Sequence, residues 1–253
     1  MSPPVKSALR VLELLEHFAE ERRPAAIGDV ASGLGWPQSS TSVLMRCLVD
    51  AGYMDQDRRT GLYAPSVRVA LATAWIQDHL YSDHNLLRLM EGVREQTGHT
   101  VMIGERRGIH VRYLHVLQST REGRFTAKTG SLRPLFGSAA GRMLLTRLPQ
   151  REVAILLRKA NAVEADTRRR HDFDRISRDI ERARREGHAE STGTSVPGAA
   201  ALAVLLPVGR DRTPMTLSVG GPMAEVRRER ERLLSVLRDA VEPLQRSVTG
   251  GGG

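Results

Sequence analysis

The stretch LGWPQSSTSVLMRCLVDAG, residues 34–52, decides the first part of the fold. Gly35 suits the positive φ of a tight turn, and Pro37 stands where a helix can begin without its N–H. The helix that follows opens with Gln38 and a run of hydroxyl residues, which are mediocre helix formers, and it stops at Gly52. Such short polar side chains let a helix approach another surface closely.

The residues on either side of this stretch complete a small domain. Apolar residues at helical spacing predict an amphipathic helix over about residues 6–20, and 27–34 predict a second helix. Residues 53–57 and 62–66 predict two short strands joined by the turn 58–61. Three helices followed by a hairpin indicate a winged helix-turn-helix, and an ordinary three-helix domain with a hairpin is the alternative.

Several residues of this segment are expected to be internal. We expect Ala31 to let the two helices cross closely and Trp36 to close the turn between them. The residues expected to form the core are Val30, Leu34, Leu44, Met45, Cys47 and Leu48.

Composition describes a globular chain. Of its 253 residues, 40% are hydrophobic and 26% are charged. The longest apolar run, AAALAVLL at 199–206, is far shorter than the roughly 20 residues of a membrane span. Cys47 is the only cysteine, and no apolar leader opens the chain. We therefore expect a cytoplasmic protein without a membrane partner.

The positive charge is unevenly distributed. The formal net charge is +9, but residues 1–79 hold eight Lys and Arg against nine Asp and Glu. The excess of basic residues lies in 80–253, where 30 Lys and Arg face 20 Asp and Glu. Because the segment that looks most like a DNA reader is nearly neutral, bulk charge is weak support for nucleic-acid binding.

The rest of the chain predicts an α+β domain. Residues 67–80 predict a connecting helix and 83–98 another, followed by paired strands around a turn at 106–108. Helices are expected at about 139–148, 150–160 and 172–186, before two buried strands and a last helix. This order indicates helices packed on an antiparallel sheet.

At this point the chain resembles the IclR family of bacterial transcription regulators. The family's opening helix is similar to SALRVLELLEHF, and its recognition helix and wing are similar to the segment 34–63. The motifs of its effector-binding domain follow in the family's order, as GHTVMIGERRG, GSLRPLFGSAAGRMLL, REGHAESTG and LSVGGPM. The resemblance implies a winged helix-turn-helix DNA-binding domain at 1–66, a linker helix at 67–80 and a GAF-like effector-binding domain at 81–248. Residues 249–253 are expected to be a disordered tail. It also implies a homodimer, often paired into a tetramer, that binds a pseudopalindromic operator and controls metabolic genes.

The predicted recognition helix departs from the family, which usually has Lys at the position of Gln38 and Arg at that of Val43. Gln38 can still bond adenine bidentately, and a helix N-terminus favours phosphate. The alternatives are that the serines only cap the helix and that the wing arginines are solvated turn charges. The candidate DNA-binding residues are Lys6, Arg10, Gln38, Ser39, Ser40, Ser42, Arg46, Arg58 and Arg59.

The resemblance also places a small-molecule effector in the second domain. Carried over by motif, its lining is Ala139, Ala140, Ala201, Ala203, Ser218 and Gly220. Because this set is mostly alanine and glycine, we expect a larger, partly apolar effector or none, with the alternative that the alanines are simply core. The N-terminus of the helix at 139 and Ser218 are the two candidate anion-binding devices.

Enzymatic chemistry has little support. The sequence has no GxSxG elbow, P-loop or HExxH motif, so we expect neither catalytic residues, a metal nor a cofactor. The alternative function is a GAF-type small-molecule-binding or enzymatic protein whose helical domain makes protein contacts.

Overall fold

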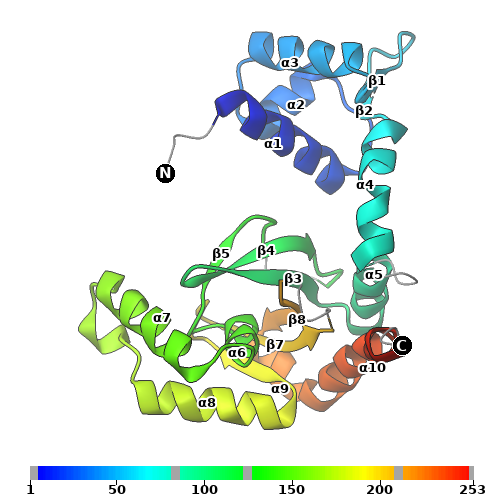
Figure 1. Ribbon diagram of the computed structural model, residues 1–253. Coiled ribbons are helices and arrows are strands. Elements are labelled where there is room, and N and C mark those ends of the chain that lie inside the picture. Colours follow the sequence, from blue (N-terminus) through cyan, green and yellow to red (C-terminus); the bar gives the residue numbers. More distant parts are fainter. Residues whose placement is uncertain (1–4, 81–85, 122–126, 208–212, 251–253) are drawn as a thin grey trace. The chain divides into compact units, whose positions relative to one another are not determined.

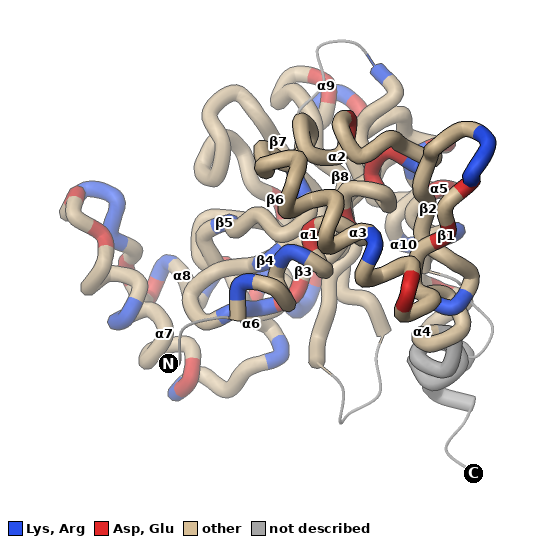
Figure 2. Tube along the Cα trace, turned by 90° about the horizontal axis from the view of Figure 1, so that it is seen from above, with Lys and Arg blue, Asp and Glu red and all other residues tan. Residues whose placement is uncertain are grey.

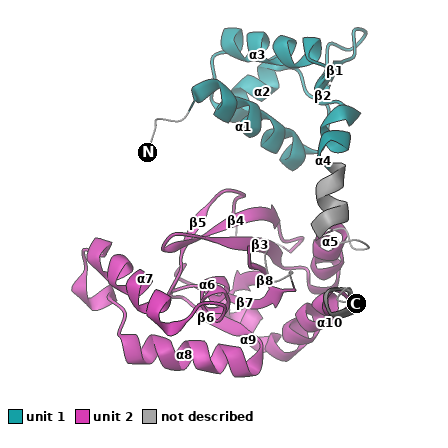
Figure 3. Cartoon of the chain, in the orientation of Figure 1, with its two compact units in different colours: residues 1–79 teal, residues 80–253 magenta. Residues whose placement is uncertain are grey.

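The computed structural model describes residues 5–80, 86–121, 127–207 and 213–250, with only the backbone described for 74–80 and 246–250. The chain divides into two compact units, 1–79 and 80–253 (Figure 3). Each unit has its own hydrophobic core and is described separately. None of the helices in the described ranges is long and apolar enough to cross a membrane.

The first unit is the expected three-helix domain with a hairpin. Its elements are α1 (Lys6–Glu21), α2 (Ile27–Leu34), α3 (Gln38–Asp50), β1 (Met54–Gln56), β2 (Tyr63–Pro65) and α4 (Val67–Leu80). Gly35 ends α2 at φ 67°, and the Trp36 N–H donates to the Ala31 carbonyl at 2.8 Å. This cap turns the chain sharply into α3, as the Gly-Trp-Pro sequence indicates.

The core of this unit joins all three helices to the hairpin. Its buried residues are Leu14, Phe18, Ala25, Val30, Met45, Leu48, Met54 and Tyr63. Leu34 and Leu44 pack against this core but remain partly exposed. The expectation that Cys47 is internal was wrong, because the buried positions of α3 are Thr41, Met45 and Leu48, and Cys47 lies on the other side of the helix.

The second unit is a six-stranded antiparallel sheet in the order β5-β4-β3-β8-β7-β6, covered by helices on both faces (Figure 1). Helices α6, α7 and α8 pack on one face, and α5, α9 and α10 on the other. The strands are β3 (Thr100–Arg107), β4 (His110–Leu117), β5 (Leu132–Pro134), β6 (Ala189–Thr192), β7 (Ala199–Leu206) and β8 (Met215–Pro222). The helices are α5 (Leu86–Thr97), α6 (Ala139–Leu145), α7 (Gln150–Val163), a 3₁₀ turn (Thr167–Arg169), α8 (Phe173–Glu186), α9 (Met223–Arg228) and α10 (Arg230–Gly250).

Three features differ from the sequence-based expectation. The short strands β5 and β6 were not predicted, since a strand of three or four residues carries little periodicity. The last helix is two helices, because the chain leaves helical geometry at Glu229. The second of these, α10, extends to Gly250, past the residue where the disordered tail was expected to begin, and 251–253 lie outside the described residues.

Alternate residues of strand β7 pack against the helices on opposite faces of the sheet. Leu202, Val204 and Leu206 point toward α5 and α10, where they join a large aliphatic core. The alternate residues Ala201 and Ala203 point toward α6. Because these side chains are small, α6 can lie close to the sheet.

The closest approach in this layer involves Gly141 of α6. A Cβ on Gly141 would lie 1.8 Å from the carbonyl oxygen of Leu135, which is backbone and has no freedom to rotate away. Glycine is therefore required here by packing, not by its φ angle. By contrast, a Cβ on Gly92 of α5 would meet no atom within 4 Å.

We predict opposite effects on stability for alanine at these two glycines. Gly141→Ala should lower the free energy of unfolding by about 3 kcal/mol, because the added methyl forces α6 away from the Leu135 carbonyl. Gly92→Ala should raise it by roughly 0.5–1 kcal/mol, because alanine is the better helix former. Urea denaturation of both variants measures this difference, and equal stability would contradict the packing argument.

Candidate DNA interface and effector cavity

The outward face of α3 is set by its buried face. Thr41, Met45 and Leu48, spaced four and three residues apart, turn inward. The exposed side chains of α3 include three residues of the predicted DNA-binding set, Gln38, Ser39 and Arg46. They also include Val43 and Cys47, whereas Ser40 and Ser42 are partly exposed.

The N-terminus of α3 is uncapped. Pro37 occupies the N-cap position, and in the described part of the chain no side chain caps the first turn. Instead, the hydroxyls of Ser40 and Thr41 both donate to the Pro37 carbonyl oxygen at 3.0 Å. The interpretation of the serines as caps was therefore wrong. The free N–H groups and the helix dipole leave this end suited to a phosphate.

Arg10 and Trp36 connect α1 to the turn before α3. The Arg10 guanidinium carbon lies 5.2 Å from the centre of the Trp36 ring, which is cation–π geometry. Trp36 also packs against the core of the first unit, as expected. Arg10 is consequently held near the start of α3, whereas Lys6 is exposed at the first residue of α1.

The hairpin between β1 and β2 presents basic residues at its tip (Figure 2). Asp57 shapes this turn: its carboxylate accepts from the Arg59 N–H at 2.8 Å and from the Thr60 hydroxyl at 2.8 Å. The Thr60 hydroxyl first, and then the Arg59 N–H, lower the pKa of Asp57. Because Asp57 binds the backbone of the turn, the exposed side chains of Arg58 and Arg59 are left to point outward.

Val43 and Cys47 are exposed residues of α3 that the sequence-based set of contacts omitted. The Val43 side chain is 62% exposed, unusual for a valine on a helix with a packed opposite face. The spacing of the buried residues could have shown this, because positions 43 and 47 are four apart and neither falls on the Thr41–Met45–Leu48 line. An apolar side chain here suits contact with a thymine methyl group.

Four of the six predicted effector-binding residues line one cavity in the second unit. Ala139 and Ala140 contribute from α6, Ala201 from β7 and Ser218 from β8. Ala203 is fully buried in the core, and Gly220 is not among the residues that line the cavity. The cavity measures 20 Å³, which is room for about one water molecule.

The lining is more polar than its alanines indicated. Strands β4, β5 and β6, the loop after β6 and the residue before α6 add phenol, guanidinium and further hydroxyl groups to the Ser218 hydroxyl of the motif-based set. These polar residues are Tyr113, Arg133, Ser138, Ser191 and Ser195. The hydroxyls of Ser195 and Ser218 are buried and have no hydrogen-bond partner among the described residues.

Arg133 brings a positive charge to this cavity. Ser138 caps α6 by accepting from the Gly141 N–H at 3.1 Å, so one N–H of the expected anion device at this helix end is already used. The Arg133 guanidinium carbon lies 5.5 Å from the centre of the Tyr113 ring. Burial raises the pKa of Tyr113, and Arg133 opposes that shift. The phenol is therefore neutral beside a cation.

Two sequence families match this chain along most of its length. Residues 83–246 match the family described as bacterial transcriptional regulator IclR C-terminal, and residues 7–58 match the IclR helix-turn-helix domain. The chain belongs to the IclR family. It is a transcriptional regulator with an N-terminal helix-turn-helix DNA-binding domain and a C-terminal effector domain.

Relatives of the IclR family align with this chain over nearly its whole length. It is 23% identical to the glycerol operon regulatory protein of Streptomyces coelicolor over 99% of both chains. It is also 23% identical to the transcriptional repressor IclR of Escherichia coli, over 89% of this chain and 83% of that protein. The crystal structure of Thermotoga maritima IclR superposes with a TM-score of 0.61 at 15% identity, covering 96% of this chain and 98% of that one. Nothing in these matches supports the alternative of a protein whose helical domain makes protein contacts.

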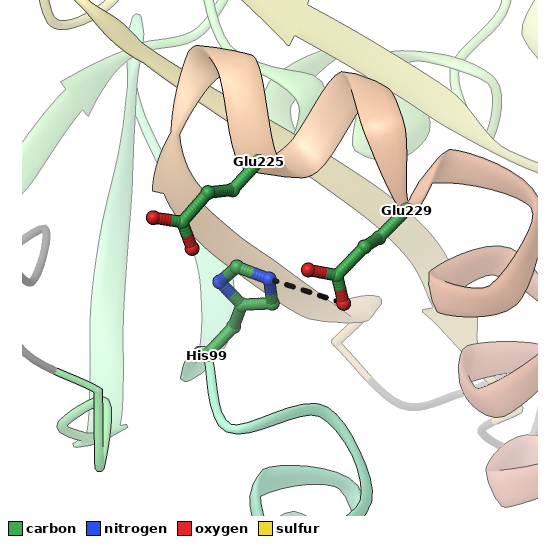
Figure 4. Close-up of side chains that lie close together, drawn as sticks. All are labelled: His99, Glu225 and Glu229. Atoms are coloured by element: carbon green, nitrogen blue, oxygen red, sulfur yellow. Dashed lines mark ion pairs between the residues drawn. The ribbon is translucent and has the colours of Figure 1, made fainter.

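This IclR-family chain also brings together three groups with metal-ligand chemistry. His99, Glu225 and Glu229 have ligand atoms within 4.8 Å of one another, and both carboxylates point toward the imidazole (Figure 4). The Arg121 guanidinium already fills the space between the carboxylates, donating to Glu225 at 3.1 Å and to Glu229 at 2.7 Å. We interpret the group as an ion-pair cluster that ties the segment after β4 to α9 and the start of α10.

The ion-pair cluster shifts the pKa of Glu229. Hydrogen bonds from Arg121 lower the pKa of Glu229 from 4.5 to about 2. A carboxyl whose pKa is lowered by folding stabilises the fold above its unfolded pKa, and this stabilisation is lost as pH falls toward the folded value.

We therefore predict that Glu229→Gln has a lower melting temperature than wild type, and that this deficit is largest above about pH 5. The deficit should shrink between about pH 4.5 and pH 2. Melting curves of wild type and variant across this range measure the deficit. Glu231→Gln is the control, since that side chain is 84% exposed and should have little effect on melting. A deficit that does not depend on pH would contradict the role given to the Glu229 charge.

Proposed function

We propose that this protein binds a pseudopalindromic operator as a homodimer, or a dimer of dimers, and that a small anion in the effector cavity changes its affinity for DNA. The observation that carries the DNA-binding part is the outward face of α3, whose uncapped N-terminus lies next to exposed short polar side chains. The proposed contacts are Lys6, Arg10, Gln38, Ser39, Ser40, Ser42, Arg46, Arg58 and Arg59. Operator binding would place the protein in the bacterial cytoplasm.

Different residues of the interface are proposed to read bases and to bind phosphates. Gln38 and Arg46 lie on the outward face of α3 with Ser42 between them, one helical turn apart in each direction. Gln38 has the chemistry to read a base edge, whereas Arg58 and Arg59 at the wing have the charge to hold phosphates. Arg46 is partly engaged, because its Nε donates to the Ser42 carbonyl at 3.3 Å. Affinity therefore depends strongly on the wing and on Arg10.

A homodimer is supported by exposed apolar residues on two helices of the first unit. On α1, Leu9 and Leu12 are 42% and 56% exposed, and Val5 just before the helix is 68% exposed. On α4, Val67 and Leu71 are 71% and 68% exposed. Apolar residues repeating at helical spacing on a surface indicate a protein contact. A second copy would also supply the second recognition helix that a pseudopalindrome requires.

Metabolic control is supported by the relatives. One is named as the regulator of a glycerol operon, and an aligned protein of Salmonella typhimurium is named an acetate operon repressor. We accordingly propose that this chain controls a metabolic operon in response to an intermediate of that metabolism.

The proposed effector is small and anionic. At 20 Å³ the cavity holds about one water molecule, so any organic effector requires its walls to move, and a small ligand requires the least movement. Arg133 supplies a positive charge, and the unpartnered hydroxyls of Ser195 and Ser218 can donate to a carboxylate. This replaces the expectation of a partly apolar ligand, because a hydrophobic molecule would leave these buried hydroxyls without partners.

The interface predicts different effects for two sets of variants. Replacing both Arg58 and Arg59 by Ala should weaken binding to all DNA and reduce the slope of log K against log salt by about two for each bound subunit, which is about four for a dimer. Gln38→Ala should leave that slope unchanged and reduce the preference for the operator over random DNA. Fluorescence anisotropy on DNA from upstream of the protein's own gene, over a salt series, measures both quantities.

A matched control is the double replacement of Arg106 and Arg107 by Ala, which removes two adjacent arginines at the β3–β4 turn of the second unit. This control should bind DNA like wild type. Footprinting should show two half-sites about one helical turn apart, or a multiple of that spacing. A flat salt response would contradict operator binding, and a single protected half-site would contradict the dimer.

The effector cavity predicts which ligands stabilise the protein. Two- and three-carbon carboxylic acids should raise the melting temperature, and long-chain acids and lactones should not. Ser218→Ala should abolish this response because it removes a buried hydroxyl from the cavity, whereas Ser235→Ala, an exposed serine on α10, should leave it intact. Stabilisation by hydrophobic acids alone would contradict the polar cavity.

A further inference from the structure

A second cavity lies at one edge of the six-stranded sheet. Strand β6 is the last in the sheet order and pairs only with β7. A cavity of about 490 Å³ runs beside it, with walls from α6, α8, β6, α9 and α10. It shares no lining residue with the effector cavity. It is therefore a separate place where a ligand could bind.

The walls of this β6-edge cavity carry an excess of positive charge. Four arginines face three carboxylates: Arg142, Arg182, Arg227 and Arg230 against Asp179, Glu186 and Glu190. Two of the carboxylates are each close to an arginine, and the third is close to a histidine. Asp179 lies 2.5 Å from Arg182, Glu190 lies 2.9 Å from Arg230, and Glu186 lies 3.6 Å from His188. Among the described residues Arg227 forms no ion pair, and Arg142 forms only a long one, 4.0 Å from Asp179.

Arg142 is the more unusual of the two because most of its side chain is removed from solvent. Its side chain is 16% exposed, and the nearest carboxylate oxygen, on Asp179, is 4.0 Å away. Its Nε is buried and has no hydrogen-bond partner among the residues that the structure describes. Burial lowers the pKa of Arg142, opposed mainly by Asp179. A buried guanidinium with a long ion pair and an unused donor is costly unless an acceptor reaches it.

Arg227 of α9 offers the second charge to the lining. It is exposed on α9, and among the described residues it forms no ion pair. Two guanidinium groups from different helices can hold two oxyanion groups, since each planar fork matches a carboxylate or a phosphate. Thr192 of β6 adds a hydroxyl to the lining.

We propose that the β6-edge cavity binds a small molecule with at least two negative charges, carboxylate or phosphate, held mainly by Arg142 and Arg227. The ligand would complete the hydrogen bonding of Arg142 and neutralise the charge that the protein leaves open. Arg142 lies on α6, the short helix whose first residues, Ala139 and Ala140, line the effector cavity. The two sites therefore share one structural element, and a ligand at the edge acts on the helix that the effector contacts.

The experiment is calorimetric titration of the full chain with pyrophosphate and, separately, with citrate, at constant ionic strength set by sodium chloride. Wild type should bind one equivalent of at least one of these anions per chain. Arg142→Gln and Arg227→Gln should each weaken binding by about tenfold or more, the usual loss for a charge-assisted hydrogen bond. Binding of pyrophosphate alone would identify a phosphorylated ligand, and binding of citrate alone a polycarboxylate.

Two controls keep the result specific. Arg178→Gln removes an exposed arginine from α8 that does not line the cavity, and it should bind like wild type. Ser218→Ala alters the effector cavity and should also leave this binding unchanged. Because Arg227 is exposed, its variant should fold even if Arg142→Gln does not. The proposal is overturned if neither anion binds, if Arg227→Gln keeps wild-type affinity, or if Arg178→Gln weakens binding equally.

Discussion

The burial of Thr41, Met45 and Leu48 on one side of α3 is the constraint on which the DNA-reading surface depends. These residues join the helix to the core formed with α1, α2 and the hairpin, so α3 cannot rotate about its axis without exposing them. That packing determines which side chains face outward. It places Gln38 and Arg46 outside, and it also exposes Val43, where the family usually has an arginine. The outward face is consequently short of positive charge.

This shortage of charge explains how neighbouring elements contribute to the interface. Arg10 is held by stacking on Trp36, and the wing arginines are displayed by a turn that Asp57 organises. Each of these cations is positioned by a contact that does not use its whole donor set, so each keeps donors for phosphate. The first unit, nearly neutral as a whole, thus presents its few basic groups from α1, α3 and the hairpin.

In the second unit, α6 is the element that links the two cavities. Its residues are small where they meet the sheet, and Gly141 allows a backbone approach that no other residue permits. One end of this helix meets the effector cavity, and Arg142 one turn further lines the cavity at the β6 edge. Such close packing transmits small displacements, because a tightly packed helix moves as a body instead of deforming.

The sequence by itself determined the elements of the first unit and most of those in the second, because glycine, proline and apolar periodicity are local signals. It also identified most of the candidate contacts, including the loss of charge at Gln38 and Val43. The tertiary structure decided what depends on residues far apart in the chain. Cys47 proved to be exposed, Ser138 proved to cap α6, and the cavity lining proved polar, since Ser191 and Ser195 reach it from another strand and loop. The physical reason is that a motif reports the neighbours of a residue along the chain, whereas burial, pairing and charge compensation depend on its neighbours in space.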